Sequence, residues 1–322
     1  MKNWGKEGER SEVLENSELL FVSPCPTLPP VLNSFMPDLV FLNGSIVPEA
    51  EARVSIFDRG FLYGDGIFET VRVANGRLFN WGAHVHRFEH GLALLRVRCP
   101  FSPDSLQASA MELIQRSQMS RGLMRLCVSR GVGVRGYSTR GADQPTVAIM
   151  VYPSDAPPRS EPLRWSAHVS RQRLLSGQDV SRSKTASKLV QILARMEAED
   201  AGADEALLLN ERGEVIEASG CNFFWISGGR VYAPTLDAGA LPGVAGQTVE
   251  TVCERLRIPF LRSCLPLAEL LKVDGAFLTT SSQGVVELIA VDRSDLARSP
   301  LVLQIWQRFE AWVDTETRAS TR

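Results

Sequence analysis

The sequence predicts a two-domain protein of mixed α/β (α+β) class, and three observations support this prediction. The chain has 322 residues, about twice the length of a typical domain. Hydrophobic residues make up 44% of it and charged residues 22%, as is usual for globular proteins. Short apolar runs bounded by glycine turns alternate with longer runs whose apolar residues recur three and four positions apart, which is the pattern of strands followed by helices.

The first predicted domain spans residues 37–154 and is α+β. Leu39–Leu42 is a short apolar run, and Asn43-Gly44 is a type I′ hairpin signal before Ile46-Val47. Its further predicted elements are a strand at Ile67–Val73, a helix carrying Trp81, Val85, Phe88, Leu92 and Leu95, a helix carrying Leu106, Ala110, Leu113 and Ile114, and strands at Leu123–Ser129 and Thr146–Tyr152.

Two segments are predicted to lie outside the domains. Residues 1–36 are polar and then proline-rich, without a sustained period, so we expect a flexible tail. Residues 155–162 belong to a proline-rich stretch that begins at Pro153. Because proline excludes both helix and ladder, this stretch is the predicted linker.

The larger second domain, residues 163–322, is predicted to be α/β. Leu189, Ile192, Leu193 and Met196 lie at helical spacing, and Gly202 is a natural residue to follow the helix. The other predicted elements are strands at Ala206–Leu209, Val215–Ala218, Asn222–Ile226, Ala276–Thr280 and Val285–Val291, a helix beginning near Gly243, and a closing helix carrying Ile305, Phe309, Trp312 and Val313.

The composition excludes several classes of function. The net charge of −2 offers no basic field for a nucleic acid, and no apolar run approaches the ~20 residues of a membrane span. The six cysteines are scattered without a C-x-x-C pair, which suits a reducing compartment. We therefore expect a cytoplasmic protein that binds neither nucleic acid nor membrane.

Two short motifs match known sites but lack the required context. Gly131–Gly136 fits G-x-G-x-x-G, yet a turn-rich stretch follows it where a dinucleotide site needs a helix. His86–His90 fits H-x-x-E-H, an inverted zinc-protease motif, on a helix that is amphipathic without a metal. The other two histidines, His84 and His168, have no evident supporting acid motif. We expect a loop at the first motif, solvent-facing histidines at the second, and no metal site.

A longer series of motifs, in order along the chain, is more specific. It consists of Phe57–Thr70 (FDRGFLYGDGIFET), His84–Arg87, Lys184–Leu189, Ala203–Asn210, Val215–Asn222 and Leu241–Val244. This series resembles the class IV pyridoxal-phosphate enzymes. The resemblance implies the two-domain fold of type IV, as in D-amino-acid aminotransferase, with pyridoxal 5′-phosphate as cofactor.

The cofactor needs an amine for its aldehyde, an anion at its ring nitrogen, and cationic or N–H donors for its phosphate. By resemblance, Lys184 is the catalytic lysine, with Lys188 as the fallback and as a cation that lowers its pKa. Glu217 resembles the carboxylate at the ring nitrogen, and Arg87 the phosphate-binding arginine. The alternative interpretation of each residue, taken by itself, is an ordinary surface side chain without a role in a site.

The remaining site residues follow from the same resemblance. Val244 and Ala245 open a helix whose free N–H groups bind anions, although the family often has a threonine hydroxyl where Ala245 stands. Ser281 resembles a second phosphate-binding turn. Tyr63 and Arg135 are the substrate-side candidates; Tyr63 is alternatively a core residue and Arg135 an exposed loop residue.

Three functional hypotheses remain. Ser129–Thr139 and Asn222–Trp225 resemble segments of aminodeoxychorismate lyase, which implies release of pyruvate and 4-aminobenzoate in folate biosynthesis. The alternative is a class IV aminotransferase of branched-chain or D-amino acids. The third is a non-catalytic or metal-dependent relative that uses the helix at His86–His90. The resemblance also implies a small-molecule amino substrate and a homodimer.

Overall fold

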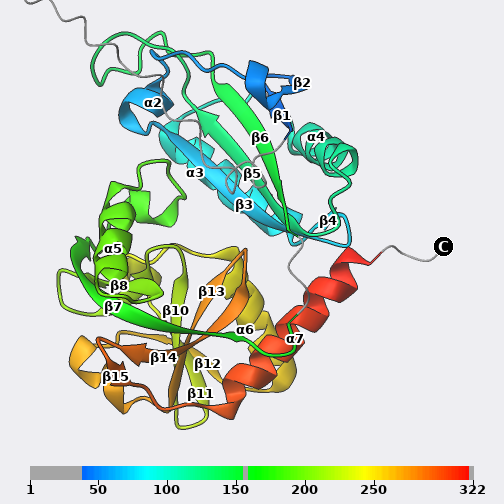
Figure 1. The fold of residues 1–322 in the computed structure, drawn as a ribbon. Coiled ribbons are helices and arrows are strands. Elements are labelled where there is room, and N and C mark those ends of the chain that lie inside the picture. The colour runs from blue at the N-terminus through cyan, green and yellow to red at the C-terminus, as the bar shows by residue number, and fades with distance from the viewer. Residues whose placement is uncertain (1–37, 155–158, 319–322) are drawn as a thin grey trace, which may run out of the picture. The chain divides into compact units, whose positions relative to one another are not determined.

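The computed structural model describes residues 38–154 and 159–318, which are built around two β-sheets (Figure 1). The predicted tail, residues 1–36, lies outside the described residues, as do residues 155–158 of the predicted linker. One sheet is formed before this gap and the other after it. The mixed α/β class is therefore confirmed, whereas the domain boundaries stay a prediction.

The first sheet has six antiparallel strands in the order β2-β1-β6-β5-β3-β4. Asn43 and Gly44 both have positive φ, as the type I′ hairpin requires. Helices α3 and α4 pack on the sheet through one apolar core. The bounds are β1 Leu39–Leu42, β2 Ser45–Pro48, β3 Gly66–Ala74, β4 Arg77–Leu78, α3 Trp81–Leu95, α4 Pro103–Arg116, β5 Gly122–Ser129 and β6 Thr146–Pro153.

The second sheet has nine strands, and six of them close into a ring. Eight of the strands follow the order β12-β11-β10-β13-β14-β7-β8-β9, and β15 pairs with β14. β9 pairs back to β10 through Glu217 and Asn222. The bounds are β7 Leu163–Leu174, β8 Glu205–Asn210, β9 Val215–Ala218, β10 Asn222–Ser227, β11 Arg230–Pro234, β12 Phe260–Ser263, β13 Gly275–Thr280, β14 Gly284–Val291 and β15 Ser294–Asp295.

Strand β10 lies between two apolar cores, because its successive side chains point to opposite faces of the sheet. Phe223 and Trp225 belong to one core, together with strands β8, β9, β13 and β14. Phe224 and Ile226 belong to the other, beneath helices α6 (Val244–Leu256) and α7 (Pro300–Thr317). The first turn of α6 is thereby held against one face of β10.

Helix α5 (Leu189–Asp200) was correctly predicted as a helix, but its larger apolar side chains do not enter the core. Leu189, Ile192 and Met196 are exposed, while Ala194 and Ala198 are buried against β7 and β8. The small alanine side chains let the helix approach the sheet closely. Helical spacing predicts an apolar face, but it does not say what covers that face.

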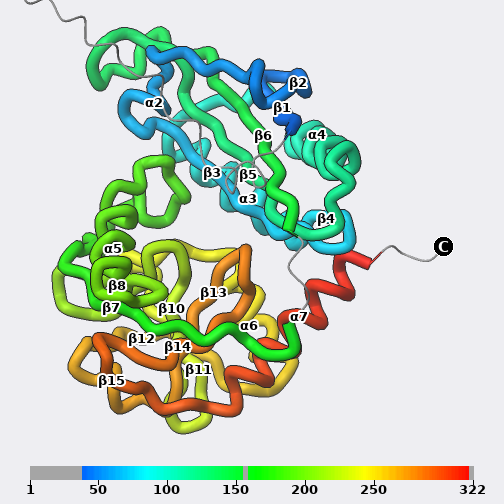
Figure 2. Tube along the Cα trace, viewed as in Figure 1, coloured from blue at the N-terminus to red at the C-terminus, as the bar shows by residue number. Residues whose placement is uncertain are grey.

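Several elements were not predicted. The first eight residues of β7 do alternate apolar and polar side chains, as in a half-buried strand, so the signal for this strand was present but was missed. β11, β12 and the short helix α2 (Arg59–Tyr63) have too few residues to show a period. Among the described residues, no helix is both long and apolar enough to cross a membrane. The segment between β7 and α5, which includes the 3-10 turn η2 (Asp179–Arg182), runs toward the first sheet before it returns into α5 (Figure 2).

Candidate active site

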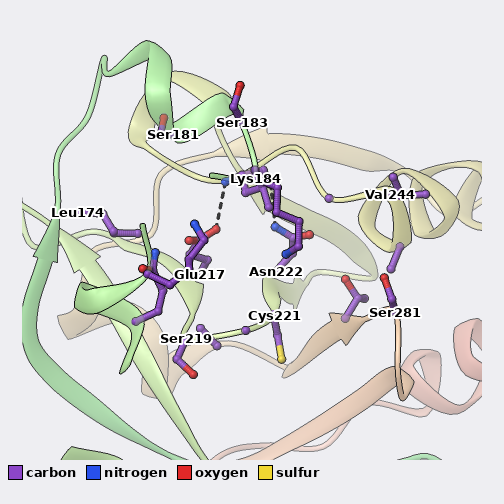
Figure 3. A pocket seen from close by; sticks show the side chains of 18 of the residues that line it. Leu174, Ser181, Ser183, Lys184, Glu217, Ser219, Cys221, Asn222, Val244 and Ser281 are labelled. Atoms are coloured by element: carbon purple, nitrogen blue, oxygen red, sulfur yellow. Dashed lines mark hydrogen bonds between the residues drawn. The ribbon is translucent and has the colours of Figure 1, made fainter. Parts of the chain in front are cut away.

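A cavity of about 300 Å³ brings together the predicted catalytic and cofactor residues. Residues of β3 and α3 contribute to its lining, with the segment before α5, strands β9 and β10, and the start of α6. The predicted residues that line it are Lys184, Arg87, Glu217, Val244, Ala245 and Ser281. Figure 3 labels four of them, Lys184, Glu217, Val244 and Ser281. Six residues spread over almost two hundred positions thus share one cavity.

The main chain around Lys184 is paired with β3. The N–H of Phe68 donates to the Lys184 carbonyl at 2.9 Å, and the N–H of Ala186 donates to the Gly66 carbonyl at 2.8 Å. The Nζ atom of Lys184 lies 4.8 Å from the centre of the Phe68 ring, within cation–π distance. The side chain is therefore held just before α5 and lines the cavity.

The surroundings make the Lys184 amine less basic. Burial, followed by the positive charge of Arg87, lowers the pKa of Lys184 to about 8, and Lys188 acts in the same direction. Glu69 and Glu217 oppose this shift. Lys188 was the predicted cause of the lowered pKa, but burial and Arg87 contribute more. An amine with a pKa near 8 is mostly protonated at neutral pH, but a much larger fraction of it is unprotonated than of an ordinary lysine, and a nucleophile or base requires that unprotonated form.

Glu217 provides a carboxylate in the cavity wall. Its Oε2 atom accepts a hydrogen bond from the N–H of Leu241 at 3.0 Å. Burial raises the pKa of Glu217, while that hydrogen bond and the charges of Lys188 and Lys184 oppose the rise. Figure 3 shows Glu217 on one side of Asn222, and Val244 and Ser281 on the other side. The carboxylate therefore lies away from the start of α6.

The start of α6 lines the end of the cavity where the sequence predicts anion binding. Gly243 is the N-cap and no side chain caps the helix, so N–H groups of the first turn point outward without intrahelical partners. A side chain at position 243 would force Asn222 to move, since an added Cβ would lie 1.6 Å from its Oδ1 atom. Arg87 approaches the same place, because its Nη1 donates to the Pro242 carbonyl at 3.0 Å. This end suits a phosphate group.

A buried carboxylate that the sequence analysis did not assign holds Arg87 in place. Glu69 is 1% exposed and accepts hydrogen bonds from Nε and Nη2 of Arg87, at 2.8 and 2.6 Å. Nδ1 of His84 lies 2.7 Å from Oε2 of the same carboxylate. The expectation that His84 has no supporting acid is therefore wrong, and so is the same expectation for His168, whose Nδ1 lies 2.8 Å from Oδ1 of Asp292. The available signal was an acidic residue inside the apolar run Ile67–Val73.

The two substrate-side candidates do not line this cavity. Tyr63 is half-buried, and its hydroxyl accepts a hydrogen bond from the Gly136 N–H at 3.2 Å, whereas Arg135 is exposed. Arg59, which is 3% exposed, holds the loop of Arg135 by donating to the carbonyls of Gly136, Tyr137 and Ser138. The substrate roles of Tyr63 and Arg135 stay predictions.

The two isolated motifs have the local structure that was expected. Gly131–Gly136 lies in the loop between β5 and β6 and does not begin a helix. His86, Glu89 and His90 are exposed on α3. Within 38–154 and 159–318, no group of three or more histidine, cysteine or acidic residues is arranged to hold a metal ion.

Comparison with known proteins identifies the family. The family described as "Amino-transferase class IV" matches residues 66–291. The chain is 30% identical over 253 residues to aminodeoxychorismate lyase of Bacillus subtilis (strain 168), which covers 78% of this chain and 85% of that protein. It is 25% identical over 281 residues to D-alanine aminotransferase of Bacillus licheniformis, covering 86% and 98%. The chain belongs to the class IV aminotransferase family.

The solved structures agree with this assignment. The crystal structure of a T.th. branched-chain amino acid aminotransferase with pyridoxamine 5′-phosphate superposes with a TM-score of 0.81 at 25% identity, covering 88% of this chain and 95% of that one. The protein is thus a pyridoxal-phosphate-dependent transaminase or lyase with the type IV fold. The cavity fits the cofactor, because it offers an amine of lowered pKa, a carboxylate and an uncapped helix start.

The Glu69 cluster predicts a specific dependence of stability on pH. Burial opposes ionisation of Glu69, but hydrogen bonds from Arg87 and His84 outweigh it and lower the pKa from 4.5 to about 2. Since the unfolded chain takes up this proton first as the pH falls, the stabilisation is present above about pH 4.5 and is lost toward about pH 2. Glu69→Gln lacks this contribution. As the pH falls from about 4.5 to about 2, the difference in free energy of unfolding between the wild type and Glu69→Gln therefore shrinks by roughly 2–3 kcal/mol.

Denaturant unfolding of both proteins at successive pH values measures this difference. The control is Glu112→Gln, because Glu112 forms an exposed ion pair with Arg116 that contributes little. A wild-type advantage over Glu69→Gln that stays constant as the pH falls would show that Glu69 is not ionised in the folded protein.

Proposed function

We propose that the protein is an aminodeoxychorismate lyase, which converts 4-amino-4-deoxychorismate into 4-aminobenzoate and pyruvate in cytoplasmic folate biosynthesis. The observation that carries any reaction here is the Lys184 amine, with a pKa of about 8, in a cavity between Glu217 and the start of α6. The choice of a lyase is supported by the B. subtilis relative and by the resemblance of Ser129–Thr139 and Asn222–Trp225 to that enzyme.

Each residue has a defined task in this proposal. Bound pyridoxal phosphate supplies an aldehyde for the substrate amine and a ring that takes up the electron pair left on the neighbouring carbon. Nζ of Lys184 removes the proton from the carbon that bears the amine. Glu217 holds a proton at the ring nitrogen, and Arg87 with the first turn of α6 binds the phosphate.

The elimination balances without an oxidant or reductant. As the C–H bond breaks at the amine-bearing carbon, the C–O bond to the enolpyruvyl group breaks at the next ring carbon, and the ring becomes aromatic. The departing enolpyruvate takes up a proton and becomes pyruvate. In this proposal the protonated Lys184, which lines the cavity, returns that proton. Arg135 is the proposed partner of the substrate's carboxylate, with its loop held by Arg59.

The reaction is tested with purified protein, pyridoxal phosphate and 4-amino-4-deoxychorismate. We expect 4-aminobenzoate and pyruvate to form in equal amounts, and Lys184→Ala to lose activity by at least about 10²-fold, because it removes the proton-transfer group. Lys272→Ala, which changes an exposed lysine paired with Glu269, retains activity. Absence of both products, with glutamate formed from 2-oxoglutarate and an amino acid, would contradict the lyase proposal.

The second candidate is a class IV aminotransferase. The similarity to the T.th. branched-chain enzyme and to the B. licheniformis D-alanine enzyme favours it. Transamination needs the same amine but a site that accepts an amino donor and a keto acid in turn. The assay with 2-oxoglutarate and L-branched-chain or D-amino acids distinguishes this candidate from the lyase.

We propose that the protein acts as a homodimer, as the family resemblance implies. Exposed apolar side chains lie on α5, which starts five residues after Lys184, and on the loop of Arg135, where Val132, Val134 and Tyr137 are exposed. Exposed apolar surface of this kind favours contact with another chain. Arg135 is exposed and does not line the cavity of its own chain. In a dimer it would reach the active site of the second copy.

The double variant Ile192→Glu with Met196→Glu tests this assembly, because two carboxylates on the exposed face of α5 oppose its burial in an interface. We expect the wild type to sediment as a dimer and the double variant as a monomer. The matched control, Ile192→Leu with Met196→Leu, keeps the face apolar and stays dimeric. A monomeric wild type, or a double glutamate variant that remains a dimer, would contradict the proposed interface.

A further inference from the structure

One buried hydroxyl in the cavity wall has no hydrogen-bond partner within the protein. Thr279, on β13, lines the cavity and is 2% exposed. Over residues 38–154 and 159–318, its Oγ1 atom is the one buried side-chain oxygen or nitrogen without a partner. A buried hydroxyl that is left unpaired destabilises the protein, so this atom in a cavity wall calls for a partner outside the protein.

The ladder shows which way the Thr279 side chain faces. Thr279 is the cross-strand partner of Asn222 on β10, and opposed residues of an antiparallel ladder share a face. Two residues earlier on the same face, Phe277 stacks on Phe224 beneath α6, with ring centres 4.9 Å apart. The Thr279 hydroxyl is therefore on the face of the sheet that the first turn of α6 covers.

The first turn of α6 is the part of the helix that attracts an anion. Asn222 contacts it closely, since an added Cβ at Gly243 or Gly246 would lie within 3.4 Å of its Oδ1 atom. α6 has 13 residues, its N-cap Gly243 offers no side chain, and Ala245 offers no hydroxyl. The unpaired hydroxyl of Thr279 is a second observation, independent of the helix, that points to a ligand at this place.

We propose that Thr279 is a further ligand of the cofactor phosphate: its hydroxyl donates a hydrogen bond to a phosphate oxygen, beside the N–H groups that open α6. The proton stays on the threonine oxygen, and no bond other than the hydrogen bond forms. This supplies the partner that the buried hydroxyl lacks in the protein. The inference rests on pyridoxal phosphate as cofactor and is independent of the choice between lyase and transaminase.

The test compares two ligands that differ only in the phosphate. Pyridoxal 5′-phosphate and pyridoxal are titrated into cofactor-free wild type and Thr279→Val, which replaces the hydroxyl by a methyl group of similar size. In Thr279→Val, the dissociation constant for pyridoxal phosphate is expected to be about 10- to 100-fold higher than in the wild type, because a hydrogen bond to a charged group contributes more than a hydrogen bond between neutral groups. Binding of pyridoxal stays unchanged.

The stability of the cofactor-free protein separates this role from a structural one. Thr279→Val unfolds at the same or a higher denaturant concentration, since an unpaired buried hydroxyl is removed. Thr317→Val is the matched control: this fully buried hydroxyl donates to the Val313 carbonyl at 2.7 Å, far along α7. That variant loses stability but keeps the wild-type preference for the phosphorylated ligand.

Thr279→Ser restores the hydroxyl and is expected to keep the preference for pyridoxal phosphate over pyridoxal. The proposal is overturned if Thr279→Val binds pyridoxal phosphate as tightly as the wild type, or if Thr279→Ser loses as much affinity as the valine variant. A wild type that does not discriminate between the two ligands would overturn it as well. The lyase assay tests a different claim. If the protein forms no 4-aminobenzoate and Thr279→Val still loses the preference for pyridoxal phosphate over pyridoxal, the lyase proposal fails and this inference holds.

Discussion

The active site depends on a short stretch of backbone pairing between β3 and the segment that carries Lys184. Two hydrogen bonds, from Phe68 to the Lys184 carbonyl and from Ala186 to the Gly66 carbonyl, join the first sheet to the chain leading into α5. β3 also carries Glu69, which holds Arg87. One strand therefore positions both the Lys184 amine and the Arg87 guanidinium, the proposed reactive amine and phosphate ligand. A shift of one residue in this register would turn the Lys184 side chain away.

Charge is distributed unevenly around the cavity, and this distribution determines what each group can do. Arg87, Lys184 and Lys188 bring three cations to the lining, against the single carboxylate of Glu217. The Lys184 amine is less basic because it is buried among like charges, while Arg87 is compensated from behind by Glu69. An excess of positive charge suits a phosphorylated cofactor with an acidic substrate. It is the same electrostatic arrangement that makes the amine reactive.

The parts of the site that the sequence predicted are those with a local pattern. The hairpin at Asn43-Gly44, the helix at Leu189 and the helix start at Gly243 each follow from spacing or turn chemistry within a few residues. The resemblance to class IV enzymes then selected Lys184, Glu217 and Arg87, and the structure places all three in one cavity. Without that resemblance, each was one charged residue among many.

The parts that escaped prediction depend on contacts between distant segments. Glu69 and His84 are fifteen residues apart, and only the packing of α3 on β3 brings them together. The sequence around Thr279 predicts only a strand. The pairing of β13 with β10 puts Thr279 beside Asn222, on the face of the sheet that α6 covers. The exposed face of α5 shows the same limit, because the periodicity of a helix does not determine its neighbours.

The most direct measurement of the central claim is to locate the covalent bond between protein and cofactor. The protein is incubated with pyridoxal phosphate, reduced with borohydride, digested, and its labelled peptide sequenced by mass spectrometry. A single label on Lys184 is expected, because this amine has a pKa of about 8 inside the cavity that holds Glu217 and Arg87. A label on Lys188 or on any other lysine, or no label at all, would contradict the assignment.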